Sequence, residues 1–329
     1  MINGETQQKI KALRLEFEQL KSGRESLLAI IGETEFPEQV YNSNAIENST
    51  LTLKETEKIL LEQTVMRQVS VRELFEAKNL ARVLEYLAGH PELELTVKNI
   101  TWFHQILLGG INDGFAGRLR GPGEYVRVGT HIAPPPEHVE RLLNDLIQRY
   151  ASNSDWYFLD NIAWFHAEFE RIHPFCDGNG RIGRVLINFQ LARFGYPPII
   201  IRNKDKHENY YPHFRRYVDD GVFSGFETYF ALALQESLHK RLAYLKGVNV
   251  QKVTDWAEAV GKNKNAVLNA ARRQTIPAFR EKGVWKIGAE QTDIPNDETL
   301  AALDWAKTYK KSGQKTGYKS TQELYQSLD

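Results

Sequence analysis

Apolar residues recur every three or four positions along most of the chain, which is the spacing of one face of an α-helix. The clearest case is the segment 156–172, which carries a stripe formed by Phe158, Ile162, Phe165, Phe169 and Ile172. Similar stripes predict helices within the segments 7–88, 96–110, 137–151, 181–194 and 210–245. The pattern therefore predicts a mainly α fold with the helix 156–172 in its core.

Glycine and proline predict where the helices are interrupted. Gly32 and the pair Phe36 and Pro37 predict breaks within the first fifty residues. Thr52 followed by Glu55 fits a capping box, so a helix is expected to begin at residue 53. The residues from Tyr41 to Asn48 then belong to a short helix or turn before it.

Two segments depart from the helical pattern. The glycine- and proline-rich stretch 109–136 contains one alternating piece, residues 125–129, which predicts a strand of a hairpin between helices. Near residue 248 a second unit begins, with a helix, a turn at Gly261, a helix over about 263–273 and extended pieces at 276–279 and 284–287. This order predicts a small winged helix-turn-helix.

These patterns divide the chain into four parts. We expect an N-terminal helical region at 1–90, a helical core at 91–238, the winged helix-turn-helix at 246–290 and a helical tail at 291–329. The 329 residues, 42% hydrophobic and 26% charged, exclude disorder throughout the chain. The single cysteine, Cys176, excludes an internal disulfide, and no apolar run approaches the length of a membrane span. We therefore expect a cytoplasmic protein without a membrane partner.

The charge is balanced over the whole chain but not along it. The 42 Lys and Arg against 42 Asp and Glu argue against a uniformly basic nucleic-acid binder. Residues 239–288, however, hold 11 Lys and Arg against three Asp and Glu, a net charge of +8. We expect DNA contacts from its second helix, through Lys262, Lys264, Arg272 and Arg273, and from its wing, through Arg280, Lys282 and Lys286. A solvated basic face or a surface for protein contacts is the alternative.

The segment 173–184, HPFCDGNGRIGR, carries the strongest chemical signal. Its glycine-rich loop leads directly into a helix N-terminus, whose unpaired N–H groups and dipole favour an anion. Arg181 and Arg184 lie one turn apart and can both face a polyphosphate. Asp177 offers an oxygen ligand for Mg²⁺, Asn179 can donate to a phosphate, and His173 can act as a general base.

The pattern His-x-Phe-x-Asp-Gly-Asn-Gly-Arg-x-x-Arg resembles the signature of the Fic domain, a family of protein AMP transferases. The resemblance implies a helical Fic core over about residues 90–235, with ATP as substrate and Mg²⁺ as metal. It implies that His173 takes the proton of a target Tyr, Thr or Ser hydroxyl that attacks the α-phosphate. Asp177 would hold the metal and Phe175 would anchor the loop. The phosphate ligands would be Asn179, the amides of Gly178 and Gly180, and the side chains of Arg181 and Arg184.

The resemblance also assigns the surroundings of this loop. Residues 125–129 take the place of a flap that holds the target polypeptide by strand addition, although a hairpin that only closes the core is the alternative. Nucleotide contacts are implied for Val128, Gly129, Thr130 and His131, and for an aromatic pair near adenine, Tyr210 and Tyr211. The asparagine that some members carry shortly after this pair is absent, because Arg216, Tyr217 and Val218 stand there.

An upstream segment, Ser-Asn-Ala-Ile-Glu-Asn at 43–48, resembles the inhibitory motif found before some Fic cores. Ser43 and Glu47 lie on one face of a helix, so that Glu47 can pair with Arg184 in place of the γ-phosphate. A solvated surface glutamate is the alternative. In similar proteins, relief of inhibition accompanies a change of oligomer, for which we keep a homodimer as a hypothesis. The same glutamate can also help to remove AMP from the modified target.

The leading hypothesis is thus an ATP- and Mg²⁺-dependent protein adenylyltransferase held back by Glu47. The alternative from another class is a DNA-binding regulator whose Fic core serves as a nucleotide sensor. A related phosphotransferase of the Doc type carries lysine where this chain has Gly180, which favours AMP transfer, while transfer of UMP or phosphocholine stays open. A nucleophilic Cys176 with His173 as its base is disfavoured, because cysteine chemistry has no use for the two arginines.

Overall fold

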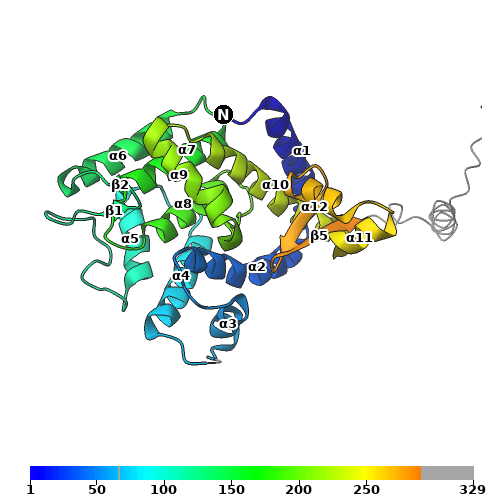
Figure 1. The fold of residues 1–329 in the computed structure, drawn as a ribbon, viewed down its shortest axis with the longest axis horizontal. Helices are drawn as coiled ribbons and strands as arrows, with labels where there is room; N and C mark the ends of the chain where they lie inside the picture. Colours follow the sequence, from blue (N-terminus) through cyan, green and yellow to red (C-terminus); the bar gives the residue numbers. More distant parts are fainter. Residues whose placement is uncertain (66, 290–329) are drawn as a thin grey trace, which may run out of the picture.

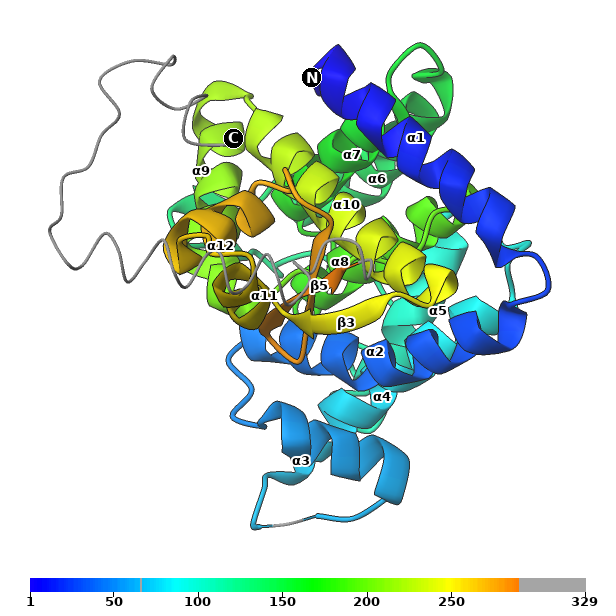
Figure 2. The same ribbon diagram turned by 90° about the vertical axis from the view of Figure 1, so that its right-hand side faces the viewer.

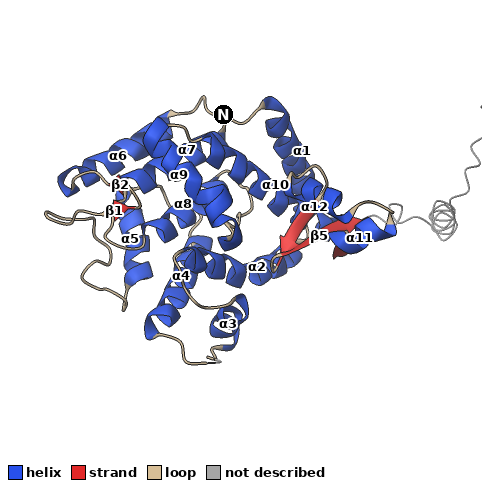
Figure 3. Cartoon of the chain, viewed as in Figure 1, coloured by secondary structure: helices blue, strands red, loops and turns tan. Residues whose placement is uncertain are grey.

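A computed structural model describes residues 1–65 and 67–289, and this part of the chain is mainly helical (Figure 3). The mainly α fold class is therefore confirmed. The predicted helical tail at 291–329 lies outside the described residues. Among the described residues, every helix is too short or too polar to cross a lipid bilayer.

The helices follow the chain order drawn in Figure 1. We call residues 173–178, which begin the signature, the signature loop. Before it lie α1 (Gly4–Lys21), α2 (Glu25–Ile46), α3 (Leu53–Glu57), α4 (Val71–Gly89), α5 (Val97–Leu108), α6 (Pro136–Ser152) and α7 (Phe158–Ile172). After it lie α8 (Asn179–Arg193), α9 (Tyr211–Asp220) and α10 (Ser224–Lys246). Short turns of other helix types occur at η1 (Lys58–Glu62), η2 (Asn203–Asp205) and η3 (Lys206–Tyr210), of which η1 and η3 are π-helical.

The helix α7 lies in the centre of the core, as its stripe predicts. Ile162, Phe165, Phe169 and Ile172 are completely buried. One side of α7 packs in a cluster with α4, α5, α6 and α8, and the other side packs in a second cluster with α1 and α10. Its C-terminal end, where the signature loop begins, is therefore held from several directions.

The predicted breaks at Gly32 and at Phe36 and Pro37 are wrong, because α2 continues through all three positions. A proline inside a helix costs about 3 kcal/mol. Buried contacts next to it offset this cost, since Ile31 and Val40 belong to the core and Glu35 and Glu38 form buried ion pairs. The inhibitory motif therefore lies in the last turn of a long helix. The predicted capping box of Thr52 and Glu55 is confirmed at the start of α3.

The C-terminal unit contains the predicted helix, turn, helix and hairpin in that order. These elements are α11 (Val253–Ala259), α12 (Lys264–Arg272), β4 (Ala278–Glu281) and β5 (Val284–Ala289), with Gly261 in the left-handed conformation between the helices. An additional strand that the pattern did not predict, β3 (Asn249–Lys252), pairs with β5 and gives the antiparallel order β3-β5-β4. The winged helix-turn-helix assignment of this unit stays a prediction.

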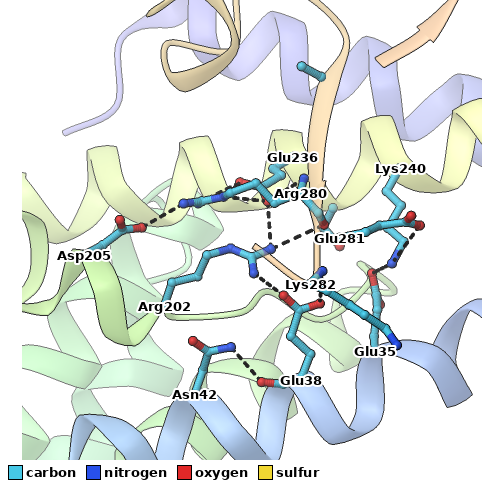
Figure 4. Close-up of polar contacts among 12 residues, drawn as sticks. Glu35, Glu38, Asn42, Arg202, Asp205, Glu236, Lys240, Arg280, Glu281 and Lys282 are labelled. Carbon is cyan, nitrogen blue, oxygen red and sulfur yellow. Dashed lines mark hydrogen bonds and ion pairs between the residues drawn. The ribbon is translucent and has the colours of Figure 1, made fainter. Parts of the chain in front are cut away.

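The C-terminal unit packs against α10, and α2 also lies beside its sheet in the two perpendicular views (Figures 1 and 2). A buried network of charges joins the three (Figure 4). Arg280 on β4 pairs with Glu236 on α10, and Arg202 pairs with both Glu236 and Glu38 on α2. Lys240 on α10 lies 3.2 Å from Glu35 on α2. The unit is thus joined to the core by ion pairs as well as by apolar contacts.

The structure places the three predicted wing residues differently, and DNA contacts from the wing stay a prediction. Arg280 pairs with Glu236 and Asp205, Lys282 with Glu57 on α3, and Lys286 with Glu281. Arg280 and Lys282 therefore join the hairpin to residues outside the unit, whereas Lys286 pairs within the hairpin.

Candidate active site

His173 follows the last residue of α7 and adopts a left-handed backbone conformation, with φ 49° and ψ 63°. Such a conformation costs a non-glycine residue about 1–3 kcal/mol and is typical of functional sites. The Nδ1 atom lies 3.3 Å from the carbonyl oxygen of Glu170, so Nδ1–H can donate there and leave Nε2 as the basic nitrogen. Burial, partly opposed by this hydrogen bond, lowers the pKa of His173 to about 4. The imidazole is therefore neutral near pH 7, as a general base requires.

The loop after His173 is closed by a side chain that bonds to its own backbone. The amide of Asn179 accepts from the Phe175 N–H at 2.9 Å and donates to the Phe175 carbonyl at 2.8 Å. Phe175 is fully buried, at the position where the resemblance implied an anchor. Asn179 is only 2% exposed. Both polar groups of the Asn179 side chain thus bond within the loop, and its donation to a phosphate stays a prediction.

His104 on α5 supports the same loop and was not predicted as a functional residue. Its ring stacks on Phe175 with the centroids 3.7 Å apart. Nδ1 accepts from the Gly117 N–H, which leaves Nε2–H to donate to the Asp177 carbonyl at 2.9 Å. Burial lowers the pKa of His104 to about 4, so that this neutral tautomer persists. The one sequence signal was a histidine on a largely apolar predicted helix.

The N-terminus of α8 faces a carboxylate. Gly178 precedes the helix with φ 81° and provides no side-chain cap, so the first N–H groups are free to bind an anion. A Cβ atom on Gly180 would lie 2.3 Å from Oε1 of Glu47 and 3.1 Å from Nη1 of Arg184. The Glu47 carboxylate therefore stands directly against the first turn of α8, where an anionic ligand would bind.

Arg184 joins α8 to the last turn of α2. Its Nη2 atom lies 2.8 Å from Oε1 of Glu47 and 2.8 Å from the carbonyl oxygen of Ser43, and its Nε atom lies 2.9 Å from the Ser43 hydroxyl. Arg184 is 6% exposed. Burial lowers the pKa of Arg184. The carboxylate of Glu47 outweighs burial and holds this pKa above its ordinary value. The structure thus brings Ser43 and Glu47 of the upstream motif into contact with Arg184 of the signature.

Asp177 and Arg181 point toward α4. The Asp177 carboxylate receives hydrogen bonds from Arg72 at 2.8 Å and from Arg181 at 3.2 Å, and Arg181 also pairs with Glu76 on α4. Burial raises the pKa of Asp177, but the two arginines outweigh it and lower the pKa. Within the described residues no three His, Cys, Asp or Glu side chains form a metal cage. Because Mg²⁺ is often held by one carboxylate together with substrate phosphates, Asp177 fits a metal shared with a nucleotide.

A cavity of about 470 Å³ lies between the flap, α7, α8 and α9. This volume is within the range of small-molecule sites. The cavity is lined by most of the predicted nucleotide residues, which are Val128, Gly129, Thr130, His131, His173, Gly180, Arg184, Tyr210 and Tyr211, and also by Glu47 and Glu170. Asp177, Gly178, Asn179 and Arg181 belong to the loop and the start of α8 but do not line it. Phe214 adds an aromatic wall that was not predicted.

The two tyrosines differ in what they offer a ligand. Tyr210 is fully buried and its hydroxyl lies 2.8 Å from Nε2 of His166, so it belongs mainly to the core. Tyr211 is 37% exposed and donates its hydroxyl to the carbonyl of Ile46 at 2.9 Å. Its ring is the one of the pair that is accessible enough to stack on a base.

The flap is shorter than predicted. Only β1 (Arg127–Val128) and β2 (His131–Ile132) pair, with Val128 opposite His131. Gly129 takes a positive φ of 60° in the turn, which is why the strand predicted over 125–129 ends there. Val128 and Ile132 remain 43% and 69% exposed. The exposed edge offers backbone groups to an extended peptide.

Glu170 is a buried carboxyl that the sequence did not single out. It lies one turn before His173 on α7, with Oε2 3.7 Å from Nδ1 of the imidazole. Burial raises the pKa of Glu170 to about 8, with a further contribution from Glu47 and an opposing one from Arg184. Glu170 is therefore neutral near pH 7 and places no charge beside the base.

The base at the end of α7 lies beside the N-terminus of α8 and a cavity of about 470 Å³, an arrangement that suits a ligand carrying phosphate groups. Residues 94–191 match the model of the Fic/DOC family. Over this segment the chain is therefore similar to the Fic/DOC family.

Curated relatives and solved structures agree with this assignment. The chain is 33% identical over 185 residues to the protein adenylyltransferase Fic of Nematostella vectensis, covering 53% of this chain and 41% of that one. It is 29% identical over 257 residues to the Drosophila melanogaster protein of the same name, covering 75% of this chain and 51% of that one. The chain thus spans about half the length of these curated relatives, or less.

Two solved structures share the fold. A Fic domain containing signaling protein from Bacteroides thetaiotaomicron has a TM-score of 0.66 at 26% identity, over 72% of this chain and 97% of that one. Fic-1 from C. elegans has a TM-score of 0.63 at 27% identity, over 72% of this chain and 70% of that one. These matches extend well beyond residues 94–191, so the helices around the Fic domain are shared as well.

Proposed function

We propose that this protein is an adenylyltransferase that transfers AMP from ATP to a hydroxyl group of a target protein and of itself. The observation that carries the proposal is the position of His173, a neutral base in a cavity that is also lined by Gly180 and Arg184 of α8. The names of the curated relatives support AMP transfer as the reaction.

In the proposed reaction, Nε2 of His173 takes the proton of the target hydroxyl as its oxygen attacks the α-phosphorus of ATP. The bond between the α-phosphorus and the oxygen bridging to the β-phosphate breaks, and pyrophosphate leaves with that electron pair. The N–H groups of the first turn of α8 stabilise the charge on the phosphates. Mg²⁺ shared between Asp177 and the phosphates would neutralise part of this charge.

Inhibition by Glu47 is part of the proposal. The Glu47 carboxylate occupies the anion position on Gly180 and Arg184, so a γ-phosphate cannot take the same partners. ATP would then bind in an unproductive pose. The same carboxylate would orient a water molecule that removes AMP from a modified target, which is tested by release of AMP from a premodified target with wild-type protein and with Glu47→Gly.

Binding of the target is proposed at the flap. The two-residue strands leave exposed backbone at β1 and β2 next to His131 and His173. An extended segment that adds to this edge would bring its hydroxyl side chain to the base.

The test of the reaction uses ATP labelled at the α- or the γ-phosphate in separate incubations with the Glu47→Gly protein. We expect label on the protein only from the α position, and none when His173→Ala is added. Cys176→Ala in the same background is the control and should retain activity, because Cys176 lies outside the cavity lining. Transfer only from the γ position would replace AMP transfer with a kinase reaction.

A second candidate function, DNA binding, is proposed for α12. Lys262, Lys264, Arg272 and Arg273 are all exposed, while Val267 and Ala271 on the opposite face are buried in the unit's own core. A basic face on the second helix of such a unit suits phosphate and base contacts. We expect salt-dependent retention on duplex DNA that is reduced by Arg272→Ala with Arg273→Ala. The charge-matched control, Lys98→Ala with Arg141→Ala on α5 and α6, should retain binding, and equal losses in both would remove the assignment.

A further inference from the structure

The last turn of α2 is held by side chains from a distant segment. Nζ of Lys206 lies 3.3 Å from the carbonyl oxygen of Ala45, 3.2 Å from that of Ile46 and 3.3 Å from Oδ1 of Asn48. The hydroxyl of Tyr211 donates to the Ile46 carbonyl at 2.9 Å. The final carbonyl groups of a helix lack partners within it, so these contacts satisfy the end of α2.

Glu47 follows directly after this end. It is the C-cap residue of α2, and its backbone conformation is no longer helical. The residue after it, Asn48, has a positive φ of 67°. The position of the Glu47 carboxylate on Arg184 therefore depends on a short segment that Lys206 contacts before and after Glu47 and that Tyr211 contacts just before it.

The two side chains come from one irregular segment. Lys206 begins the π-helical turn η3 and Tyr211 begins α9 directly after it. π-Helical turns are rare and are frequent at functional sites. The ammonium group of Lys206 lies at the negative end of the α2 dipole, where a cation is favoured. Tyr211 also lines the nucleotide cavity.

We infer that Lys206 and Tyr211 are positioning residues for Glu47, and we call this pair the latch. The latch holds the last turn of α2 in place and thereby keeps the Glu47 carboxylate on Arg184. Tyr211 lines the cavity as well. A nucleotide that contacts its ring therefore contacts one of the two side chains that hold the last turn of α2. The inference rests on the proposed function, because it concerns the inhibition of that same site.

The test measures the latch first without any reaction. Amide hydrogen exchange of residues 43–48 is compared in full-length wild-type protein, Lys206→Met, Tyr211→Phe and two controls. Lys206→Arg keeps the cation, and Lys204→Met changes an exposed lysine two residues away. We expect faster exchange in Lys206→Met and Tyr211→Phe, and rates close to wild type in both controls. Tyr211→Phe removes a single hydroxyl, so it serves as the second variant should Lys206→Met fail to fold.

Automodification with ATP labelled at the α-phosphate is the second measurement. Loss of a hydrogen bond to a charged group corresponds to about a tenfold change, so Lys206→Met should raise automodification about tenfold. Lys206→Arg should restore the low wild-type level. In the Glu47→Gly background, Lys206→Met should add nothing, because the side chain that the latch positions is gone.

The outcomes separate the latch from the proposed function. Unchanged exchange in Lys206→Met and Tyr211→Phe would overturn the latch, whatever the activity. A lower activity of Lys206→Met in the Glu47→Gly background would also overturn it, because Lys206 would then serve the nucleotide and not Glu47. Faster exchange without AMP transfer by any variant, Glu47→Gly included, would support the latch and overturn the proposed function.

Discussion

Arg72 on α4 donates a hydrogen bond of 2.8 Å to Oδ2 of Asp177, the carboxylate that the signature assigns to a metal. Arg181 approaches the other oxygen at 3.2 Å, so both oxygens have a guanidinium partner. Arg72 lies outside residues 94–191, the segment that matches the family model. A residue from the N-terminal region therefore occupies part of the coordination that a metal would use.

Replacing Arg72 with alanine should strengthen metal binding in the presence of ATP. An exposed ion pair is worth at most about 1 kcal/mol, so the affinity should rise up to about fivefold. The measurement is a titration of Mn²⁺ by electron paramagnetic resonance at fixed ATP, in the Glu47→Gly background. Arg67→Ala, which removes an exposed arginine paired with Glu55, is the control and should leave the affinity unchanged. A weaker affinity in Arg72→Ala would instead make Arg72 a phosphate ligand.

Ser43 should contribute to inhibition through Arg184 and less strongly than Glu47. Its hydroxyl accepts from Nε of Arg184 at 2.9 Å, and Ser43→Ala removes that acceptor while the Glu47 pair remains. We expect automodification to rise about tenfold, as for one hydrogen bond to a charged group, and to stay below the level of Glu47→Gly. Ser26→Ala, at an exposed position in the first turn of α2, is the matched control. A rate equal to wild type would show that Glu47 holds Arg184 alone.

The signature loop could be predicted because its chemistry lies within twelve consecutive residues. The positions of His173 and Arg184 follow from a helix end, a loop and a helix start that are adjacent in sequence. The role of Asn179 could not be derived in the same way. Its amide can bond either to a phosphate or to the loop, and the choice depends on Phe175, which packs against His104 from 71 residues earlier.

The course of α2 and the docking of the C-terminal unit depend on contacts that are distant in sequence. Local propensity predicts a break at Pro37, but Glu38 pairs with Arg202 and Glu35 with Arg241 on α10. The same network uses Arg280, which the charge pattern assigned to DNA. Charge counting identifies a basic segment, and the fold decides which of its cations remain exposed.

Arg202 should be essential for stability because it is buried between two carboxylates. It is 6% exposed and pairs with Glu38 on α2 and with Glu236 on α10. Removing one partner of a buried ion pair costs about 3–5 kcal/mol, since the remaining charge loses its compensation. We expect Arg202→Ala to reduce the free energy of unfolding by that amount in urea denaturation. Arg141→Ala, which removes an exposed pair with Asp145, should cost less than about 1 kcal/mol.

A loss of less than about 1 kcal/mol in Arg202→Ala would contradict the prediction. It would mean that Arg280, which also pairs with Glu236, or solvent compensates the two carboxylates.

Glu170 should make the protein less stable as the pH rises from about 4.5 to 8. Its pKa is raised to about 8 from an ordinary value of 4.5, chiefly by burial. Between these values the folded protein keeps the proton and the unfolded chain loses it, so stability falls with rising pH. Glu170→Gln is neutral at every pH and removes this loss. The melting temperature of Glu170→Gln minus that of wild type should therefore increase from pH 5 to pH 8. We expect about 2–4 °C for each kcal/mol of unfolding free energy that the wild type loses.

The matched control for Glu170 lies two residues earlier on the same helix. Glu168 is also partly buried, but Arg171 and Tyr217 outweigh burial and lower its pKa. Its ionised form stabilises the fold above the unfolded pKa, and that contribution is lost as the pH falls, so Glu168→Gln should lower the melting temperature at pH 7. At pH 8 we expect Glu170→Gln to raise the melting temperature and Glu168→Gln to lower it. If Glu170→Gln shows no gain between pH 5 and pH 8, Glu170 is ionised in the folded protein and places a negative charge beside His173.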